Sequence, residues 1–498
     1  MIPSLALASL VSSSAQQRKS VPGVIHAPLS AHSEDKIASA WEKWRKRQTS
    51  EVDITNQQTG TAYTIDIGLG TPSQQITVLV DTGSVNLWVN PECDTSGQQE
   101  WCEGFSQFDY TSTSTIQDTG LQEELSYGKG DVVVEYVTDT VTIGSTSIEA
   151  QQFGIGIEST DIAVGILGLS PPIDGYPEYD YVLDSMVIQS LIASRAFSLD
   201  LRDVDSPDGA LILGGVDTGK YIGSLEKCPI LDGSQTTSGA DRYWITLTSI
   251  GMTAPNGNSG LLASGALAVF LDSGGTLTRL PTSVFEDIGD AFAGFGAQYD
   301  ESSGFYIIDC DTMNQSGSVD FGFNDKVISI TFENFIWHSP DSETCFLGVL
   351  ADDDEPVLGD SFLRAAYVVY DQDNANLHLA QAANCGTNLV AISSGTDAVP
   401  SVTGDCTGSS ATVATAAFSY VSTAPTVTTD VESVTSVVDP GPQGTNGATS
   451  SATLCLTCTK TTSTGSATSK PTVKAAAAER QIPFAAVVGI AALAAWLM

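Results

Sequence analysis

The chain has 498 residues, which is too many for a single hydrophobic core and indicates at least two folded units. It carries 59 acidic and 20 basic side chains, so its formal net charge at neutral pH is 20 − 59 = −39. This charge excludes a nucleic-acid-binding surface, because phosphates require clustered Lys and Arg. Most acidic residues lie within residues 48–385, and we interpret that region as suited to acidic surroundings, with solubility alone as the alternative.

The first 47 residues have the features of a secretion signal followed by a propeptide. An apolar run and then small residues predict a signal peptide over residues 1–15, with a frayed terminus as the alternative because no positive charge precedes the run. Residues 16–47 are basic and end at Lys46 and Arg47, a dibasic site for a processing protease. A basic propeptide beside an acidic body favours electrostatic inhibition; the alternative is that the dibasic pair is only a processing mark.

Residues 48–385 are predicted to be predominantly β-sheet, in two halves of similar size that span 48–228 and 229–385. β-branched and aromatic residues alternate with polar ones, and Gly and Pro mark turns between the runs. The predicted strands lie within 62–90, 132–143, 211–213, 244–250, 268–271, 328–332 and 366–370. Helical periodicity is convincing in only two segments, 182–193 and 283–292.

The C-terminal part is predicted to be a stalk followed by a lipid-anchor signal. Residues 386–470 are rich in Ser, Thr and Ala with few aromatics, which predicts a disordered, O-glycosylated stalk or, alternatively, an unmodified linker. Small residues, a polar spacer and an apolar end give residues 471–498 the layout of a GPI-anchor signal that is removed. The candidate attachment residues are Ser466 and Ala475, and a single-span tail anchor is the alternative.

The nine cysteines indicate disulfides, because the chain is predicted to be secreted. Cys93 and Cys102 would close a short loop, and Cys310 and Cys345 a longer one. A Cys-x-x-Cys pair in the predicted stalk has no His nearby, so we predict no metal site. Because nine is odd, one cysteine must be free or bonded to another chain. The pairing is left open for Cys228, Cys385, Cys406, Cys455 and Cys458.

Carboxylates are the best candidates for catalysis. The chain has four His, which disfavours Ser-His-Asp enzymes and zinc hydrolases, whereas two Asp side chains that share a proton can activate water without His. Asp-Thr-Gly or Asp-Ser-Gly occurs four times. Asp81 and Asp272 each end an apolar run and are predicted to lie where a buried strand turns sharply. Asp118 and Asp217 have the sequence context of surface turns.

Five segments carry motifs in a defined order along residues 60–385. They are 80–89 and 270–274 around the two aspartates, 126–130 with Tyr-Gly, and 163–169 and 356–364 with apolar-apolar-Gly. In this order they resemble the two catalytic loops, the flap and the crossing strands of pepsin-type aspartic endopeptidases. The narrower resemblance is to the fungal GPI-anchored yapsin-like members. It implies an all-β, bilobal pepsin-like fold, with two β-rich lobes and the active-site cleft between them.

The resemblance also implies roles for individual residues. Asp81 and Asp272 would be catalytic, holding one water and one shared proton between them. The residues that would support this dyad are Thr82, Gly83, Ser84, Ser273 and Gly274. Tyr127 and Gly128 would form the flap over the substrate, with Tyr127 hydrogen-bonded to Trp88. Cys93–Cys102 and Cys310–Cys345 fall where such enzymes carry disulfides, and no cofactor is expected.

One residue departs from the family pattern. Gly275 follows the second catalytic motif where a Ser or Thr is usual, so a hydroxyl that would bond Asp272 is missing. This predicts a shifted pH profile or weaker activity rather than its loss. Separately, Asn314 begins an N-glycosylation sequon.

The sequence therefore predicts a secreted, monomeric endopeptidase at the cell surface, held on the plasma membrane or in the cell wall by its lipid anchor. It would hydrolyse peptide and protein substrates at acidic pH. The yapsin-like resemblance implies cleavage after basic residues, with broad apolar specificity as the alternative. Two rival hypotheses are a non-catalytic surface binding or inhibitor-like protein on the same fold, and a structural wall glycoprotein.

Overall fold

The computed structural model describes residues 21–32, 62–128, 130–172, 179–202, 209–301, 303–339 and 344–408. Several predicted features lie outside these residues: the signal peptide, the dibasic pair Lys46 and Arg47, the stalk beyond residue 408, and the candidate anchor residues Ser466 and Ala475. Within the described part of the chain, no helix combines the length and the apolar character needed to cross a membrane.

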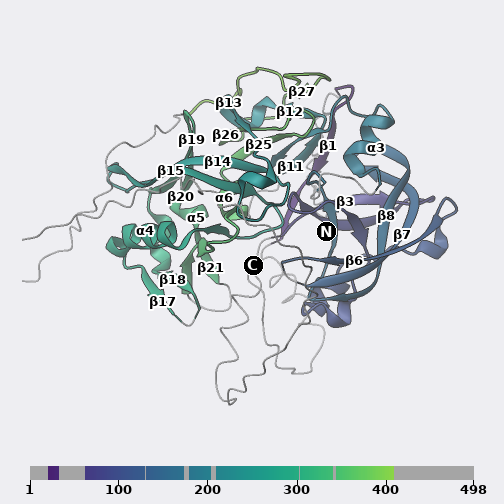
Figure 1. Cartoon of the computed structure of the whole chain (residues 1–498), viewed down its shortest axis with the longest axis horizontal. Helices are drawn as coiled ribbons and strands as arrows, with labels where there is room; N and C mark the ends of the chain where they lie inside the picture. Colours follow the sequence, from purple (N-terminus) through teal and green to yellow (C-terminus); the bar gives the residue numbers. More distant parts are fainter. Residues whose placement is uncertain are drawn as a thin grey trace, which may run out of the picture.

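Two β-rich lobes make up the molecule, as Figure 1 shows, with the N-terminal lobe on the right and the C-terminal lobe on the left. The predicted all-β bilobal fold is therefore confirmed. An eight-stranded sheet forms the N-terminal lobe. Its order is β2 (Ser30–His32), β3 (Ala62–Leu69), β4 (Gln74–Asp81), β9 (Gly165–Gly168), β5 (Leu87–Val89), β8 (Thr146–Thr160), β7 (Asp131–Ile143), β6 (Gln117–Ser126).

The C-terminal lobe contains a seven-stranded and a four-stranded sheet. The first has the order β20 (Lys326–Thr331), β19 (Ser318–Phe323), β14 (Trp244–Thr253), β15 (Ser259–Leu271), β24 (Val357–Leu358), β16 (Thr278–Leu280), β23 (Val349–Ala351). The second has the order β17 (Gln298–Asp300), β18 (Phe305–Ile308), β22 (Thr344–Leu347), β21 (Ile336–Ser339).

A six-stranded sheet joins the two halves of the chain. Its order is β1 (Ile25–Pro28), β11 (Ala210–Leu213), β10 (Ala196–Asp200), β25 (Ala366–Asp371), β26 (Asn376–Ala382), β13 (Tyr221–Pro229). The halves meet where β10 pairs antiparallel with β25, with Phe197 opposite Tyr370. These two buried rings stack with centroids 4.6 Å apart. One continuous apolar core therefore extends through both lobes.

The helices in the described part of the chain are short. The α-helices are α2 (Gln99–Glu103), α3 (Val182–Ile188), α4 (Thr282–Phe292), α5 (Phe332–Phe335) and α6 (Asp360–Leu363). The 3-10 turns are η1 (Cys93–Thr95), η2 (Tyr110–Ser112), η3 (Thr218–Lys220), η4 (Gly233–Gln235), η5 (Ala293–Phe295) and η6 (Cys310–Asn314). The first predicted helix ends earlier than expected, because Ser190 adopts a left-handed backbone with φ of 58°.

Part of the predicted propeptide is built into the sheets. β1 pairs with β11, and β2 pairs with β3. The side chains of Ile25 and Ala27 are 4% and 2% exposed, because they pack in the core behind the six-stranded sheet. Residues upstream of the dibasic pair thus supply two strands of the folded chain.

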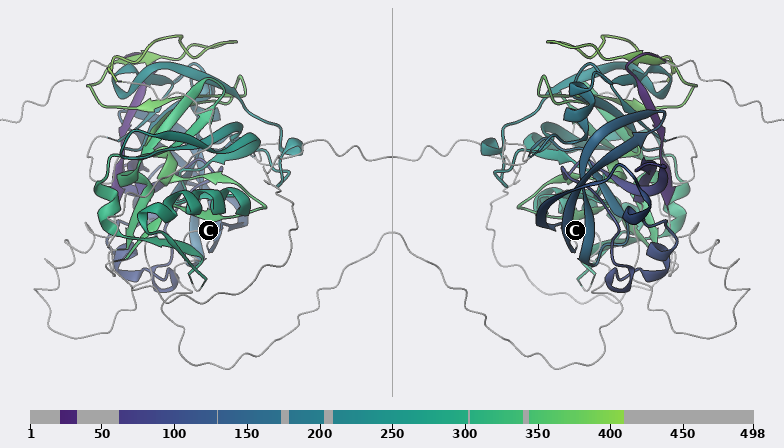
Figure 2. Two further views of the ribbon diagram at one scale, coloured as in Figure 1. Left: turned by 90° about the vertical axis from the view of Figure 1, so that its left-hand side faces the viewer. Right: turned by 90° about the vertical axis from the view of Figure 1, so that its right-hand side faces the viewer.

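The predicted start of the stalk at residue 386 is wrong, because residues 386–408 pack on the body. β27 (Leu389–Ala391) pairs with β12 (Gly215–Asp217), and Cys385 and Cys406 form a disulfide. In both side views of Figure 2 this yellow-green segment lies along the top of the molecule. Ile392 is buried in a cluster with Tyr221 and Tyr367. The composition of residues 386–470, taken as an average, did not reveal the few apolar residues near its start. These residues become buried because they pack against the folded body.

The same segment explains a second error. Asp217 is fully buried rather than in a surface turn, and its Oδ1 accepts hydrogen bonds from the backbone N–H groups of Gly219 and Asn388. Asp118 is exposed as predicted, but the predicted turn is wrong: Asp118 lies in β6, opposite Val137 and beside a bulge, where its Oδ1 accepts the N–H of Gly120.

Candidate active site

The two lobes place Asp81 and Asp272 against each other. Asp81 is the last residue of β4, and Asp272 directly follows β15. Each of these strands has a parallel neighbour that crosses behind it: β9 places Gly168 opposite Asp81, and β24 places Leu358 opposite Leu271. The predicted crossing strands are therefore present in both lobes. A β-carbon on Gly274 would lie 2.5 Å from Asp81 Oδ1 and 3.2 Å from Asp272 Oδ1, so the two carboxyl groups lie side by side, an arrangement that favours one shared proton.

A reciprocal set of hydrogen bonds locks the two loops together. The backbone N–H of Thr82 donates to Ser273 Oγ at 3.1 Å, and the N–H of Ser273 donates to Thr82 Oγ1 at 3.0 Å. Each hydroxyl then donates across the interface, from Thr82 to the carbonyl of Leu271 and from Ser273 to that of Val80. Both side chains are almost fully buried, so these bonds are shielded from water and hold the carboxyl groups in register.

Glycine is required beside each aspartate by close approach. A β-carbon on Gly83 would lie 2.6 Å from Oδ1 of Asp272, and one on Gly274 would lie 2.5 Å from Oδ1 of Asp81. Real β-carbons do not approach oxygen so closely, so any side chain at either position would displace the carboxyl group of the opposite lobe.

The two carboxyl groups have unequal donors. Asp81 accepts the N–H of Gly83 at 2.7 Å and the hydroxyl of Ser84 at 2.5 Å. Asp272 accepts the N–H of Gly274 at 2.9 Å. At Gly275 a β-carbon would meet Asp272 Oδ2 at 3.6 Å, an ordinary contact, so this position has room for a side chain that the sequence does not supply.

Burial and then the negative charge of Asp81 raise the pKa of Asp272 well above its ordinary value. The N–H of Gly274 and the positive charge of Arg242 act in the opposite direction. A carboxyl group whose pKa is raised by a second carboxyl group beside it is the arrangement in which one proton serves two acids.

The predicted flap contact is present. Tyr127 follows β6, and its hydroxyl oxygen accepts a hydrogen bond from Trp88 Nε1 at 2.7 Å. Burial and the nearby charge of Asp81 raise the pKa of Tyr127, so its hydroxyl stays neutral. Gly130, with φ of 80°, closes the turn by accepting the N–H of Tyr127 at its carbonyl, and Gly128 at the tip is exposed.

An apolar cluster lies beneath the flap. Its buried members are Trp88, Leu125, Val132, Val134, Tyr136, Ile162 and Ile166. Tyr179 packs against the same cluster and donates a hydrogen bond from its hydroxyl to Asn86 Oδ1. Sequence reasoning missed Tyr179, because it lies outside every motif and 93 residues from its partner.

Both predicted disulfides are present, Cys93–Cys102 and Cys310–Cys345. The structure adds Cys385–Cys406 and leaves Cys228 free and buried. Cys455 and Cys458 lie outside the described residues. Asn314, the sequon residue, is exposed at the end of η6.

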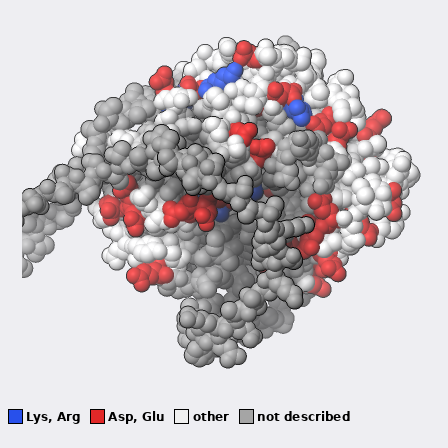
Figure 3. Space-filling model, viewed as in Figure 1, with Lys and Arg blue, Asp and Glu red and all other residues white. Residues whose placement is uncertain are grey.

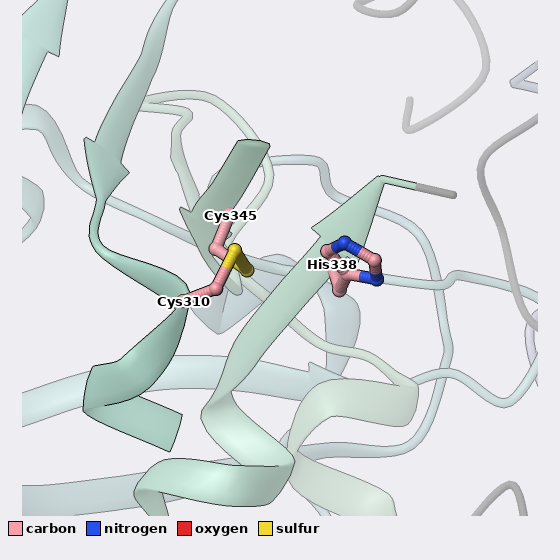
Figure 4. Close-up of side chains that lie close together, drawn as sticks. All are labelled: Cys310, His338 and Cys345. Carbon is pink, nitrogen blue, oxygen red and sulfur yellow. A yellow bond between two sulfur atoms is a disulfide. The ribbon is translucent and has the colours of Figure 1, made fainter. Parts of the chain in front are cut away.

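One side-chain group in the described residues has the composition of a metal site. The ligand atoms of Cys310, His338 and Cys345 all lie within 4.8 Å of one another. Figure 4 shows that the two cysteines are joined through their sulfur atoms, with His338 to one side. Neither cysteine can offer a thiolate while the disulfide is intact, so this group is not a metal site in the oxidised protein.

Known proteins share this fold and these motifs. The family described as eukaryotic aspartyl protease matches residues 62–382. The probable aspartic-type endopeptidase opsB of Aspergillus oryzae is 33% identical over 409 residues, which cover 78% of this chain and 82% of that protein. Candidapepsin-1 of Candida albicans is 34% identical over 391 residues, 76% of this chain and 94% of that one. The crystal structure of an aspartic proteinase from Irpex lacteus matches with a TM-score of 0.52 and 25% identity, over 65% of this chain and 94% of the other.

Two β-rich lobes with a pair of adjacent aspartates at their interface define the class of pepsin-type aspartic endopeptidases. The chain belongs to the family of eukaryotic aspartyl proteases, and the predicted hydrolase class is confirmed. The narrower, yapsin-like resemblance stays a prediction.

Proposed function

We propose that Asp81 and Asp272 are the catalytic pair of a secreted, surface-anchored endopeptidase that is active at acidic pH. The observation that carries the assignment is the placement of the two carboxyl groups side by side at the lobe interface, each against the glycine of the opposite loop. Because Asp81 accepts two donors and Asp272 one, Asp81 is the better site for the negative charge, and Asp272 holds the shared proton.

The mechanism uses one water molecule between the two acids. The carboxylate of Asp81 accepts a proton from the water as its oxygen attacks the peptide carbonyl carbon. Asp272 donates its proton to the carbonyl oxygen, so the tetrahedral intermediate is a neutral diol. The proton on Asp81 then passes to the amide nitrogen, the C–N bond breaks, and a diol hydroxyl returns its proton to Asp272. Tyr127 would cover the bound peptide, and no acyl-enzyme forms.

The test is hydrolysis of a peptide at several acidic pH values. We expect cleavage by the wild-type protein, loss of at least 10³-fold in kcat/KM for Asp81→Asn and Asp272→Asn, and block by a transition-state-mimic inhibitor. Absence of cleavage at every pH would favour the non-catalytic surface-protein hypothesis. Binding of the inhibitor with no cleavage would favour that hypothesis too.

Secretion is supported by three disulfides in the described residues, which form in oxidising compartments. A relative from Candida albicans, 34% identical, is named a secreted aspartic protease. The exposed Asn314 is accessible for glycosylation. The lipid anchor rests on the C-terminal sequence pattern, and its test is release of the protein from intact cells by a phosphatidylinositol-specific phospholipase. Retention after that treatment would contradict attachment to the plasma membrane through the lipid and leave attachment to the cell wall.

A preference for basic residues is supported by charge alone. Acidic side chains greatly outnumber Lys and Arg on the described face in Figure 3. An acidic surface raises the local concentration of basic peptides and their association rate at low ionic strength. Of the acidic residues near α3, Asp184 is already paired with Arg195, whereas Asp180 is exposed. Cleavage-site profiling on a mixed peptide library would decide between this preference and broad apolar specificity.

Mass measurement of the purified protein in solution would test the predicted monomer. N-terminal sequencing of the secreted form would test cleavage after Arg47 by a processing protease.

A further inference from the structure

Arg242 lies beside the aspartate pair without belonging to any motif. It immediately precedes Tyr243, whose carbonyl accepts the N–H of Leu271, and the next residue begins β14. Because β14 pairs with β15, with Trp244 opposite Phe270, the sheet register fixes this arginine next to the residues that lead into Asp272.

The guanidinium group contacts the catalytic loop of the opposite lobe. Arg242 Nη1 donates to the carbonyl oxygen of Gly83 at 3.2 Å. Gly83 is the residue that lies against the carboxyl group of Asp272, since a β-carbon there would be 2.6 Å from Oδ1. The guanidinium group on that carbonyl therefore lies close to the aspartate pair. Its positive charge lowers the pKa of Asp272, which favours the ionised form.

The position of the guanidinium is held from two further sides. It lies over the ring of Phe270, 5.0 Å from the centroid, in a cation–π contact. Its Nε lies 3.7 Å from Glu355 Oε1, which is an ion pair but too long for a hydrogen bond. The side chain is 24% exposed, so its charge is only partly screened by water.

We propose that Arg242 is a positioning residue for the aspartate pair, and that its positive charge stabilises the ionised pair in place of the hydroxyl absent at position 275. This inference rests on the proposed catalytic role of Asp81 and Asp272.

The charged and titratable groups around the pair support the assignment to Arg242. Asp360, buried under the second loop, faces Asp272, but burial raises its pKa and keeps it neutral at acidic pH. Tyr370 and Tyr127 also face the pair, and the pKa of each is raised, so both are neutral. Glu355 forms an ion pair with Arg242 and partly offsets its charge. Arg279 lies 3.9 Å from the same glutamate and also pairs with Asp352. Asp241 accepts the N–H of Gly233.

The measurement is kcat/KM against pH, which forms a bell whose two limbs report the two ionisations of the pair. A cation favours the more ionised state at each step, so removing it moves both limbs to higher pH. For Arg242→Gln we expect a shift of about one pH unit. For Arg242→Lys, which keeps the positive charge, we expect both limbs of the profile to lie at the same pH as in the wild type. Adding Gly275→Thr to Arg242→Gln should move the limbs back.

Arg279→Gln is the matched control. It removes the same charge from the same ion network but leaves the contact with Gly83, so its limbs should not move. Arg242→Met carries the same charge change and keeps an aliphatic stem over Phe270, in case the Gln variant does not fold. Unmoved limbs in a folded, active Arg242→Gln or Arg242→Met would overturn the inference, as would an equal shift in Arg279→Gln. Absence of activity in the wild-type protein would instead overturn the proposed function.

Discussion

Gly83 and Asp272 are in contact across the two lobes, although 189 residues separate them in the sequence (272 − 83 = 189): a β-carbon on Gly83 would lie 2.6 Å from the carboxylate oxygen Oδ1. The carboxyl group of Asp272, from the C-terminal lobe, therefore packs against the backbone of Gly83 in the N-terminal lobe.

Gly83→Ala should reduce kcat/KM at least 10²-fold, because the added methyl group displaces Asp272 from its partner. The free energy of unfolding should fall by about 1–3 kcal/mol through overpacking. Gly275→Ala is the control, since its β-carbon would meet Asp272 at an ordinary 3.6 Å and should leave activity within a factor of about three. Similar kinetics for the two alanine variants would contradict the geometric argument.

Asp272→Asn should stabilise the protein at neutral pH. The pKa of Asp272 is raised by folding, so the folded state binds the proton more tightly, and stability present at low pH is lost as the pH rises from the ordinary value of 3.8 towards neutrality. Asn has nearly the shape of the protonated acid but does not ionise, so the variant does not lose stability as the pH rises.

Denaturant unfolding at a series of pH values would measure this effect. We expect the Asn variant and the wild type to be alike near pH 3, and the variant to be more stable at pH 7 by on the order of 1 kcal/mol. Asp118→Asn, at an exposed position of β6, should show no such divergence. A lower stability of Asp272→Asn at pH 7 would exclude the assigned sign.

Tyr127→Phe removes the hydroxyl that accepts the Trp88 hydrogen bond but keeps the ring. Because the flap then loses a specific anchor, kcat/KM should fall about tenfold, with stability changed by less than about 1 kcal/mol. Tyr110→Phe, at a side chain that is 52% exposed, provides the matched loss of a hydroxyl and should behave as wild type. An unaffected Tyr127→Phe enzyme would show that the contact has no part in catalysis.

Ile392→Ala should lower the free energy of unfolding by about 2–4 kcal/mol, because Ile392 is 1% exposed in the cluster that holds residues 386–408 on the body. Ala391→Ser, at the exposed neighbouring position in β27, should change it by less than about 0.5 kcal/mol. Equal effects at the two positions would mean that this segment is not packed in solution.

Local pattern was enough to single out the two acids. Asp81 and Asp272 each end an apolar strand and are followed by a hydroxyl and a glycine, so a few consecutive residues specify both the strand and the turn. The supporting residues, the crossing strands and the flap were predicted through the resemblance to pepsin-type enzymes, which short local motifs carry.

Features that depend on distant residues were not predictable. Asp217 has the local sequence of a turn, and it is buried because Asn388, 171 residues away, covers it. Arg242 and Gly83 are 159 residues apart, and nothing near Arg242 in the sequence marks it as a neighbour of an active site. The average composition of residues 386–470 did not indicate that residues 386–408 pack against apolar residues of the body.

The crossed hydroxyls of Thr82 and Ser273 have a consequence for how this enzyme tolerates change. Each half of the chain finishes the active loop of the other, so neither half separately expressed would hold its own acid correctly. Loss of either hydroxyl would therefore misplace the aspartate of the opposite half. A substitution in one catalytic loop is tolerated only when the loop of the other half still fits it.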